Sequence, residues 1–336
     1  MASAAFQPGK NASVNVAEAY CTTDEFIAEW NKCGGNHRHL MDRFGFASCA
    51  AVCNRRRTIE RQRKMVLPSA SNNSQRNAET RRKNNRRIEM EIEDAVMVVF
   101  SDAHVWPGPR TTAQRAVPVI VKKLKPTHLF ANGDVFDGAK ISRFPASIWA
   151  MEQRPTVKQE LDACSEFLKD VQDACPTAKR LWMLGNHDMR LEARLAALVP
   201  EFEGVPGFSL KDHFPEWTFA MATFINDNLV IKHRIANGIH AVYNNAVKSG
   251  RSIVTGHLHS LKVTPWTDYN GTRYGVDTGT LADPEGPQFD YMEENPASWR
   301  AGFAVLTIRG GKLLMPELVQ VWDEEHVEFR GELIPV

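Results

Sequence analysis

The most informative stretch of the chain is AVMVVF at residues 95–100, followed at once by Ser101-Asp102-Ala103-His104. A short and purely apolar run of this length predicts a buried β-strand. The aspartate and the histidine that come directly after it carry side chains that bind metal ions. This stretch therefore predicts a metal site at the end of a buried strand.

Four more clusters of this kind follow along the chain. They are Gly133-Asp134-Val135-Phe136-Asp137 after a predicted strand at 128–132, Gly185-Asn186-His187-Asp188 after 181–184, His233 after 229–232, and Gly256-His257-Leu258-His259 after 252–255. Helices predicted at 111–125, 157–174 and 191–198 alternate with strands, which favours βαβ units and a parallel sheet. Because parallel strands end at the same edge of a sheet, we expect the clusters to meet there. The end of the chain instead predicts antiparallel strands at 303–309 and 312–322.

The five clusters contain seven candidate metal ligands. They are Asp102, His104, Asp134, Asn186, His233, His257 and His259. Carboxylate, imidazole and amide oxygen donors suit manganese, iron, zinc or similar divalent ions. One ion with an open position needs fewer ligands, so the sequence predicts two divalent ions about 3.5–4 Å apart that share a bridging carboxylate. We expect Mn²⁺, with Fe, Zn, Ni or Mg as alternatives.

The order of the motifs gives the chain a resemblance to the calcineurin-like metallophosphoesterase superfamily. The motifs are Asp-x-His, Gly-Asp-x-x-Asp, Gly-Asn-His-Asp, a single His and Gly-His-x-His, and they span residues 92–310, about two thirds of the chain. The resemblance implies an α/β fold, a sandwich of two mixed β-sheets flanked by helices, with the site at the strand ends. It also implies an enzyme, a metal-dependent hydrolase of phosphoric ester bonds.

The resemblance further implies a role for each site residue. Asp102, His104 and His259 would hold the first ion, Asn186, His233 and His257 the second, and Asp134 would bridge the two. A hydroxide bridging the ions would attack phosphorus in line, and His187 would protonate the leaving alkoxide as general acid. Asp188 would orient His187, and Asp137 would hold a ligand or a loop in place.

The N-terminal part of the chain resembles a helix-turn-helix segment. A helix is predicted to open at Thr23-Asp24-Glu25, a short helix spans 36–43, and after Gly45 a third helix covers 49–63 with Ser48 as its N-cap. In that arrangement the third helix enters the major groove of DNA. Base contacts are then expected from Ser48, Ala51, Asn54 and Arg55, and phosphate contacts from Arg56, Arg57, Arg61, Arg63 and Lys64. The alternative interpretation is a solvated basic helix.

Positive charge is concentrated near the N-terminus. Residues 55–87 contain twelve Lys and Arg against two acidic residues, a net +10 in a chain whose total is +1. Residues 88–336 contain 25 Lys and Arg against 33 Asp and Glu. This asymmetry favours a polyanionic partner. We expect a nucleic acid, and DNA in particular.

These patterns divide the chain into four parts. They are a disordered tail at 1–20, a helix-turn-helix-like DNA-binding module at 21–67, a basic flexible linker at 68–90 and the phosphoesterase domain at 91–336. The longest apolar run, residues 95–100, is too short to cross a bilayer, and the first twenty residues have no signal pattern. We therefore expect no membrane partner and a cytoplasmic location. A helix-turn-helix segment joined to such a domain resembles bacteriophage gene products, for which the cytoplasm is the host's.

Three functions fit these observations. The leading hypothesis is a two-metal phosphodiesterase or nuclease that acts on nucleic acid. The second is hydrolysis of a small nucleotide diester or a phosphomonoester, with the N-terminal module as a tether. The third is a DNA-binding regulator with a vestigial phosphoesterase domain, and the complete ligand set argues against it. The sequence leaves the natural substrate, the native metal and the oligomeric state open.

Overall fold

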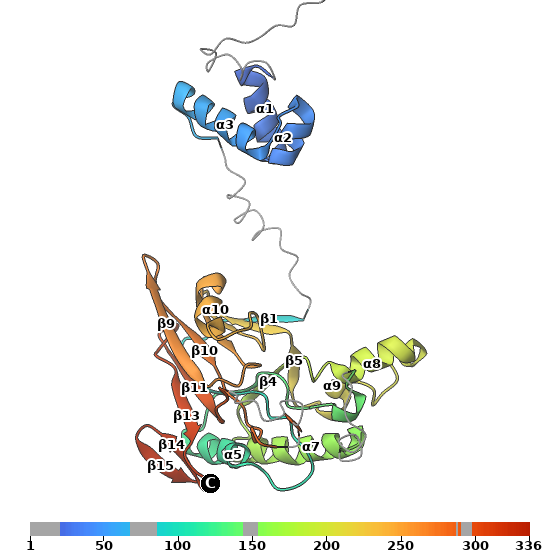
Figure 1. Ribbon diagram of the computed structural model, residues 1–336. Coiled ribbons are helices and arrows are strands. Elements are labelled where there is room, and N and C mark those ends of the chain that lie inside the picture. The colour runs from blue at the N-terminus through green and yellow to red at the C-terminus, as the bar shows by residue number, and fades with distance from the viewer. Residues whose placement is uncertain (1–20, 68–85, 144–153, 287, 290–297) are drawn as a thin grey trace, which may run out of the picture. The chain divides into compact units, whose positions relative to one another are not determined.

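A computed structural model describes residues 21–67, 86–143, 154–286, 288–289 and 298–336 (Figure 1). The chain forms two compact units, one ending at Lys83 and the other beginning at Asn84. Each unit has its own hydrophobic core. The predicted tail at 1–20 and positions 68–85 of the predicted linker lie outside the described residues.

The described part of the N-terminal unit forms the helices α1 (Thr23–Cys33), α2 (His37–Phe44) and α3 (Cys49–Arg63). Their ends follow from local sequence. Thr22 and Glu25 form a capping box before α1, and Gly45 ends α2 in the left-handed conformation that glycine adopts without strain. The helices enclose a small core of Phe26, Trp30, Leu40, Phe46, Val52, Ile59 and Leu67.

The C-terminal unit is built on two mixed sheets (Figure 1). The larger has the order β15-β14-β13-β11-β2-β3-β4-β5, with β12 paired to β11. Its strands are β2 (Ala95–Phe100), β3 (His128–Ala131), β4 (Lys179–Met183), β5 (Thr218–Ala220), β11 (Gly302–Arg309), β12 (Lys312–Leu313), β13 (Glu317–Val321), β14 (His326–Phe329) and β15 (Glu332–Pro335). Strands β2 to β5 are parallel, and β11 to β15 pair antiparallel. Both the predicted parallel region and the predicted antiparallel end are present.

The smaller sheet has the order β1-β6-β7-β8-β10-β9. Its strands are β1 (Arg87–Met90), β6 (Ala222–Ile225), β7 (Leu229–Ile231), β8 (Ser252–Thr255), β9 (Lys262–Asp268) and β10 (Gly271–Asp277). The last residues of the predicted linker form strand β1, which pairs in parallel with β6. The assignment of those residues to a flexible linker was therefore wrong.

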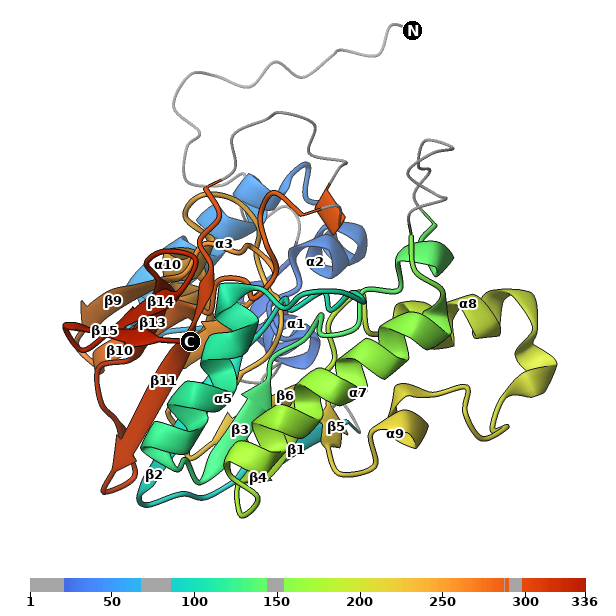
Figure 2. The same cartoon turned by 90° about the horizontal axis from the view of Figure 1, so that it is seen from below.

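Helices and short 3-10 turns complete the unit. They are α5 (Thr112–Leu124), α7 (Val157–Ala174), α8 (Arg190–Leu198), α9 (Leu210–His213), α10 (Ala241–Ser249), η3 (Ala139–Ile141) and η4 (Pro200–Phe202). Helices α5 and α7 lie side by side against the larger sheet (Figure 2). The predicted sandwich of two mixed sheets with flanking helices is confirmed.

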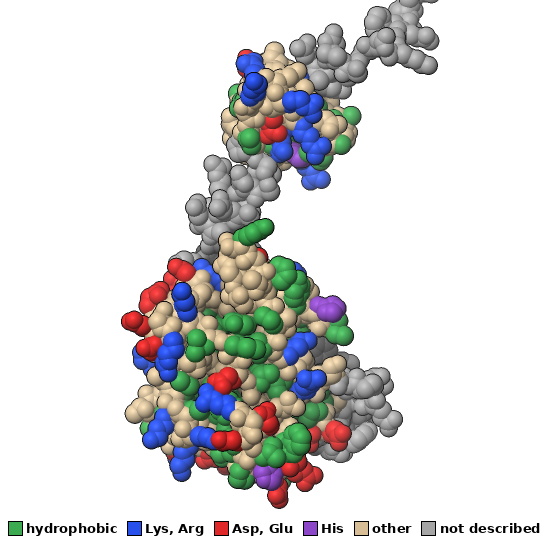
Figure 3. Space-filling view, turned by 90° about the vertical axis from the view of Figure 1, so that its left-hand side faces the viewer, with side chains coloured by type: hydrophobic (Ala, Val, Ile, Leu, Met, Phe, Trp, Pro, Cys, Tyr) green, Lys and Arg blue, Asp and Glu red, His purple; other side chains and the backbone are tan. Residues whose placement is uncertain are grey.

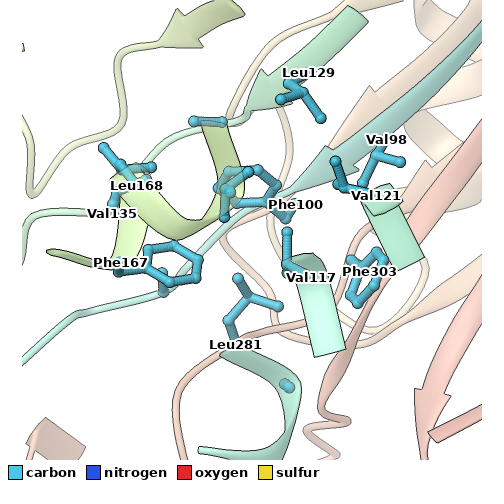
Figure 4. Close-up of a cluster of buried hydrophobic side chains, with 14 of the residues drawn as sticks. Val98, Phe100, Val117, Val121, Leu129, Val135, Phe167, Leu168, Leu281 and Phe303 are labelled. Atoms are coloured by element: carbon cyan, nitrogen blue, oxygen red, sulfur yellow. The ribbon is translucent and has the colours of Figure 1, made fainter. Parts of the chain in front are cut away.

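Strand β2 lies at the centre of the packing because both its faces are buried. Val98 and Phe100 point toward the helices, where Phe100 meets the ring of Phe167 edge-on at 5.9 Å (Figure 4). Met97 and Val99 belong to a second core that includes residues of the smaller sheet. Burial on both faces explains why this strand is purely apolar rather than alternating.

The register of the parallel strands sets the place of the site. Phe100 pairs with Ala131, and Ala131 pairs with Trp182, so β2, β3 and β4 end at nearly the same level. In the smaller sheet Ile231 pairs with Val254, so β7 and β8 also end together. The loops after these five strands carry the five motifs.

Candidate functional site

The five loops bring six of the predicted ligands and His187 into three overlapping groups of side chains. The groups are Asp102-His104-His259, His104-Asp134-His187 and Asp134-His233-His257, and within each the ligand atoms lie within 4.8 Å of one another. His104 is shared by the first two groups and Asp134 by the last two, so the three groups form one continuous cluster in which Asp134 joins the His104 side to the His233 side. Asn186 lies at the same edge, where its Oδ1 accepts a hydrogen bond of 3.3 Å from Arg234 Nη1.

The hydrogen bonds of two histidines leave ring nitrogens free for a cation. His104 Nδ1 lies 3.1 Å from Asp137 Oδ1, and His233 Nδ1 lies 2.8 Å from the carbonyl oxygen of Asn132. Each Nδ1 therefore donates, and each Nε2 presents a lone pair. Both Nε2 atoms are buried without a hydrogen-bond partner in the described residues. His233 Nε2 also faces Asp134 Oδ2 at 3.0 Å. Two lone pairs this close need a proton or a metal ion between them. Despite burial, the charges of Asp134 and Asp102 raise the pKa of His233 to about 10, so a proton on Nε2 fills this role when no metal is bound. Divalent ions fit the same donor set and would displace that proton.

Charge in the site is balanced between buried carboxylates and imidazoles. Burial opposes ionisation of Asp102, but the nearby His259 and His233 lower its pKa to about 2. Burial and the positive charge of His233 lower the pKa of His257 to about 4, so its imidazole is neutral near pH 7. A carboxylate and a neutral imidazole are the forms that bind metal.

Backbone strain is concentrated at the same residues. Among the described non-glycine residues with positive φ, half are candidate ligands: Asp102, His104, Asp134, His257 and His259. Such conformations cost about 1–3 kcal/mol each and persist only where the surroundings impose them. Strain gathered on ligand residues indicates that the fold positions them for a function.

Glycines in the motifs allow the loops to approach one another. A Cβ atom on Gly133 would collide with the His233 ring, and a Cβ atom on Gly185 would collide with the Asp134 carboxylate. Both positions therefore exclude any larger residue. This contact explains why a glycine precedes the ligand in two of the motifs.

His187 is oriented by Asp137, not by Asp188 as the sequence predicted. His187 Nδ1 lies 2.6 Å from Asp137 Oδ1, the same oxygen that holds His104. Asp137 Oδ2 accepts a hydrogen bond of 2.9 Å from Trp106 Nε1. Despite burial, the hydrogen bonds from the two histidines hold the pKa of Asp137 well below its usual range. One carboxylate thus fixes both a candidate ligand and the candidate acid.

Asp188 does not contact the His187 ring, so its predicted catalytic role of orienting His187 is corrected. Its buried carboxylate accepts hydrogen bonds from the backbone N–H groups of Asp134, Phe136 and Gly185 and from Trp182 Nε1, at 2.8–3.2 Å. It therefore ties the loop after β3 to the loop after β4. Burial and the charge of Asp134 raise its pKa to about 6.

Sequence reasoning missed three residues near the site. Arg190 Nη1 donates to the Asp137 carbonyl oxygen at 2.8 Å, and its Nη2 lies 3.1 Å from His187 Nε2. Arg190 follows His187 by three residues at the start of α8, a spacing that places two side chains together and could have indicated the contact. Glu160, fully buried on α7, accepts from the N–H groups of Gly138 and Ala139 beside Asp137, and no local motif marks it. Arg234 follows a predicted ligand directly.

The predicted DNA-contacting residues of α3 fall into two sets. Arg55 is buried, and its Nη2 donates to the Cys21 carbonyl oxygen at 3.2 Å, so the prediction of a base contact by Arg55 was wrong. Arg56 lies over the Trp30 ring and 3.4 Å from Glu60 Oε1. These two side chains support the helical unit itself. Ser48 is exposed, but its hydroxyl caps α3 by accepting from Ala51 N.

The second set forms an exposed stripe. Asn54, Arg57 and Arg61 are exposed at spacings of three and four residues, which place them on one face of α3. Neither Arg57 nor Arg61 forms an ion pair with any described residue. Several Lys and Arg side chains are visible on the face of this unit drawn in Figure 3. We refer to Asn54, Arg57 and Arg61 as the α3 stripe.

Comparison with known proteins agrees with the chemistry of the site. The sequence profile of the calcineurin-like phosphoesterases matches residues 96–283, which include all seven candidate ligands. The Gene 54 protein of Mycobacterium phage L5 is 25% identical over 245 residues, covering 67% of this chain and 93% of that protein. The Gene 54 protein of Mycobacterium phage D29 is 25% identical over 248 residues, with the same coverage.

Solved structures with similarity to this chain include two phosphoesterases and a Vps29. An archaeal phosphodiesterase aligns with a TM-score of 0.34 and 14% identity, covering 67% of this chain and 99% of that one. A dimetal phosphatase from Danio rerio gives 0.35 and 11%, covering 67% and 94%. Vps29 from Chaetomium thermophilum gives 0.38 and 9%, covering 71% and 96%. In the described part of this chain, no helix has the length and apolar character to span a membrane.

Replacement of Asp137 by asparagine should weaken metal binding. The amide keeps the size of the side chain but has a single acceptor atom, so it cannot serve Trp106 on one side and the two histidines on the other. It also loses the negative charge that strengthens the hydrogen bond from His104 Nδ1. Loss of such a supporting contact typically lowers metal affinity about 10- to 100-fold. Calorimetric titration of D137N with Mn²⁺ measures this. D162N, which alters an exposed carboxylate on α7, serves as control. Equal affinities of D137N and wild type would refute the role of Asp137.

Proposed function

The chain belongs to the calcineurin-like phosphoesterase family, and from that premise we propose that this metal-dependent phosphoesterase is a two-metal phosphodiesterase acting on nucleic acid, with DNA as its substrate. The observation that carries the proposal is the position of Asp134 between two buried groups of Asp and His side chains. Asp102, His104, Asp134 and His259 would hold one ion, and Asp134, Asn186, His233 and His257 the other. Mn²⁺ remains our expected ion.

Two ions in such a site, when bound, supply a nucleophile from water and neutralise phosphoryl oxygens. The chain's own residues do the rest. His187 delivers a proton from Nε2 to the leaving oxygen, and Asp137 stabilises its charged form through Nδ1. Arg190 can only donate hydrogen bonds, so its contact with His187 Nε2 holds that atom as an acceptor. The guanidinium must leave Nε2 before His187 can carry the proton there.

DNA is favoured as the substrate by the charge of the two units. The acidic balance of residues 88–336 repels a polyanion that approaches to within about one Debye length, about 8 Å at physiological salt. The α3 stripe offers unpaired arginines on an exposed helix. We propose that this stripe captures DNA and that α3 enters its major groove as in helix-turn-helix proteins. Like the mycobacteriophage relatives, the protein would then be a phage product that acts in the host cytoplasm.

A small-nucleotide phosphodiesterase is the second candidate. Every candidate ligand lies in the C-terminal unit, and the described N-terminal helices contribute none. This favours a substrate that the C-terminal unit can bind by itself. The test is hydrolysis with Mn²⁺ of labelled duplex DNA, single-stranded DNA, cyclic nucleotides and a chromogenic diester. Turnover of cyclic nucleotides without turnover of either DNA would favour this candidate.

His187→Ala should lower the turnover rate by an amount that depends on the leaving group. A general acid contributes about 10²–10⁴-fold when the leaving group is a poor one such as a nucleoside hydroxyl. The loss should shrink for nitrophenolate, which leaves without a proton. Steady-state kinetics with both substrate types measures the difference. An equal loss on both, or a large fall in Mn²⁺ affinity, would assign His187 to metal binding instead.

The double variant R57A/R61A should bind DNA more weakly. Each lost phosphate contact lowers the slope of log K against log salt by about 0.9, so the slope should fall by about 1.8. Affinity should drop at least about tenfold at low salt, with a much smaller change in hydrolysis of a small chromogenic diester. The control R38A/R43A removes equal charge from exposed positions of α2. If the two double variants bind DNA alike, the α3 stripe has no specific role.

A further inference from the structure

Two positively charged residues flank the candidate ligand His233. Lys232 and Arg234 follow strand β7, and Arg234 is exposed while Lys232 is half-buried. Arg234 Nη1 donates to Asn186 Oδ1 at 3.3 Å. Lys232 N donates to the Val254 carbonyl oxygen, so Lys232 continues the pairing of β7, and residues two apart in an extended segment lie on the same side. Arg234 therefore lies at the rim of the site, beside the group that includes His233 and His257.

Neither cation is neutralised by the protein. Among the residues described, no carboxylate lies within ion-pair distance of Lys232 or Arg234. Arg190 differs, because Asp137 Oδ1 lies 3.5 Å from its Nη1 and the Asp137 carbonyl oxygen accepts from it. Arg190 is thus bound to the protein, whereas Arg234 contacts only an uncharged amide.

The contact with Asn186 places Arg234 without using all its donors. An amide oxygen has two lone pairs, so Asn186 Oδ1 can accept from Arg234 and still serve an ion. The guanidinium has five N–H donors in a planar fork that matches the oxygens of a phosphate. Since the side chain is exposed and its Nη1 contacts Asn186 at the site, its other donors are open to solvent beside Asn186. That space would hold the part of a substrate next to the scissile phosphate.

We propose that Lys232 and Arg234 form a subsite for a second phosphate, the one adjacent to the scissile phosphate in a polynucleotide strand. The inference rests on the proposed function and sharpens it, because a substrate with a single phosphate has nothing to place there. A strand with several phosphates gains a charge-assisted contact next to the reacting group. The subsite thus distinguishes a nucleic acid strand from a small single-phosphate diester.

Two synthetic substrates that differ by one phosphate provide the test. The first is the p-nitrophenyl ester of thymidine 5′-monophosphate, and the second is the corresponding ester of the dinucleotide pTpT. Both release the same leaving group in a single diester cleavage. The wild-type protein with Mn²⁺ should show a lower KM for the dinucleotide ester. R234A should lose about 10- to 100-fold in kcat/KM on it, mainly through KM, and far less on the mononucleotide ester.

Matched variants separate charge from position. R234K keeps the charge without the fork and should recover part of the loss, and K232A should show a smaller loss of the same kind. R309A removes an exposed arginine away from the site. Arg309 follows Ile308, which pairs with Ala95 at the start of β2, whereas the candidate ligands follow the ends of the parallel strands. R309A should behave as wild type on both esters. The salt dependence of KM for a single-stranded oligonucleotide should fall by about 0.7 in slope for R234A, by less for K232A and not for R309A.

Three results would overturn the inference. One is a wild-type protein that hydrolyses both esters with equal KM. Another is an R234A variant that loses equally on both esters together with Mn²⁺ affinity, because Arg234 then only supports Asn186. The third is a preference for thymidine diphosphate p-nitrophenyl ester over the dinucleotide ester, which would assign the subsite to a small nucleotide. Failure of the wild type to hydrolyse any ester with any divalent ion would instead refute the proposed function.

Discussion

The carboxylate of Asp134 must lie between two groups of histidines in a buried site, and much of the C-terminal unit serves that requirement. Asp134 Oδ2 and His233 Nε2 lie 3.0 Å apart, an arrangement that needs a proton or a metal ion between the two atoms. Asp188 ties the neighbouring loops together through four hydrogen bonds. Gly185 gives the Asp134 side chain its space. Two sheets whose parallel strands end at the same level supply the loops, so the chemistry depends on the topology.

The site combines side chains that the protein holds rigidly with one arginine whose charge the protein does not neutralise. Asp137 fixes His104 and His187 and is itself bound by Trp106, so the ligand and the acid cannot move independently. Arg234 at the rim has only one neutral partner and stays available to an anion. A rigid reacting centre beside an uncompensated cation favours a substrate with more than one phosphate. In the function we propose, the basic α3 stripe would supply the attraction for a polyanion that the acidic C-terminal unit lacks.

The sequence predicted the buried elements well and the exposed ones poorly. Strand 95–100 and helices 49–63 and 157–174 have the predicted bounds, because complete burial or a full helical period marks them. Strands β1 and β9 were missed, since they lie at the edges of the smaller sheet and contain no fully buried residue. The ligand clusters followed from motif spacing. The roles of Asp137 and Asp188 did not, because each of these carboxylates stands inside a motif. Only the folded loops show that Asp137, and not Asp188, reaches His187. Arg55 shares a helical face with Val52 and Ile59, and that pattern was the available sign of its burial.

The most direct test of the central claim is an anomalous-scattering map of crystals loaded with Mn²⁺. We expect two peaks about 3.5–4 Å apart with the Asp134 carboxylate between them, one beside His104 and His259 and the other beside His233 and His257. A single peak, or a pair of peaks that Asp134 does not join, would contradict it.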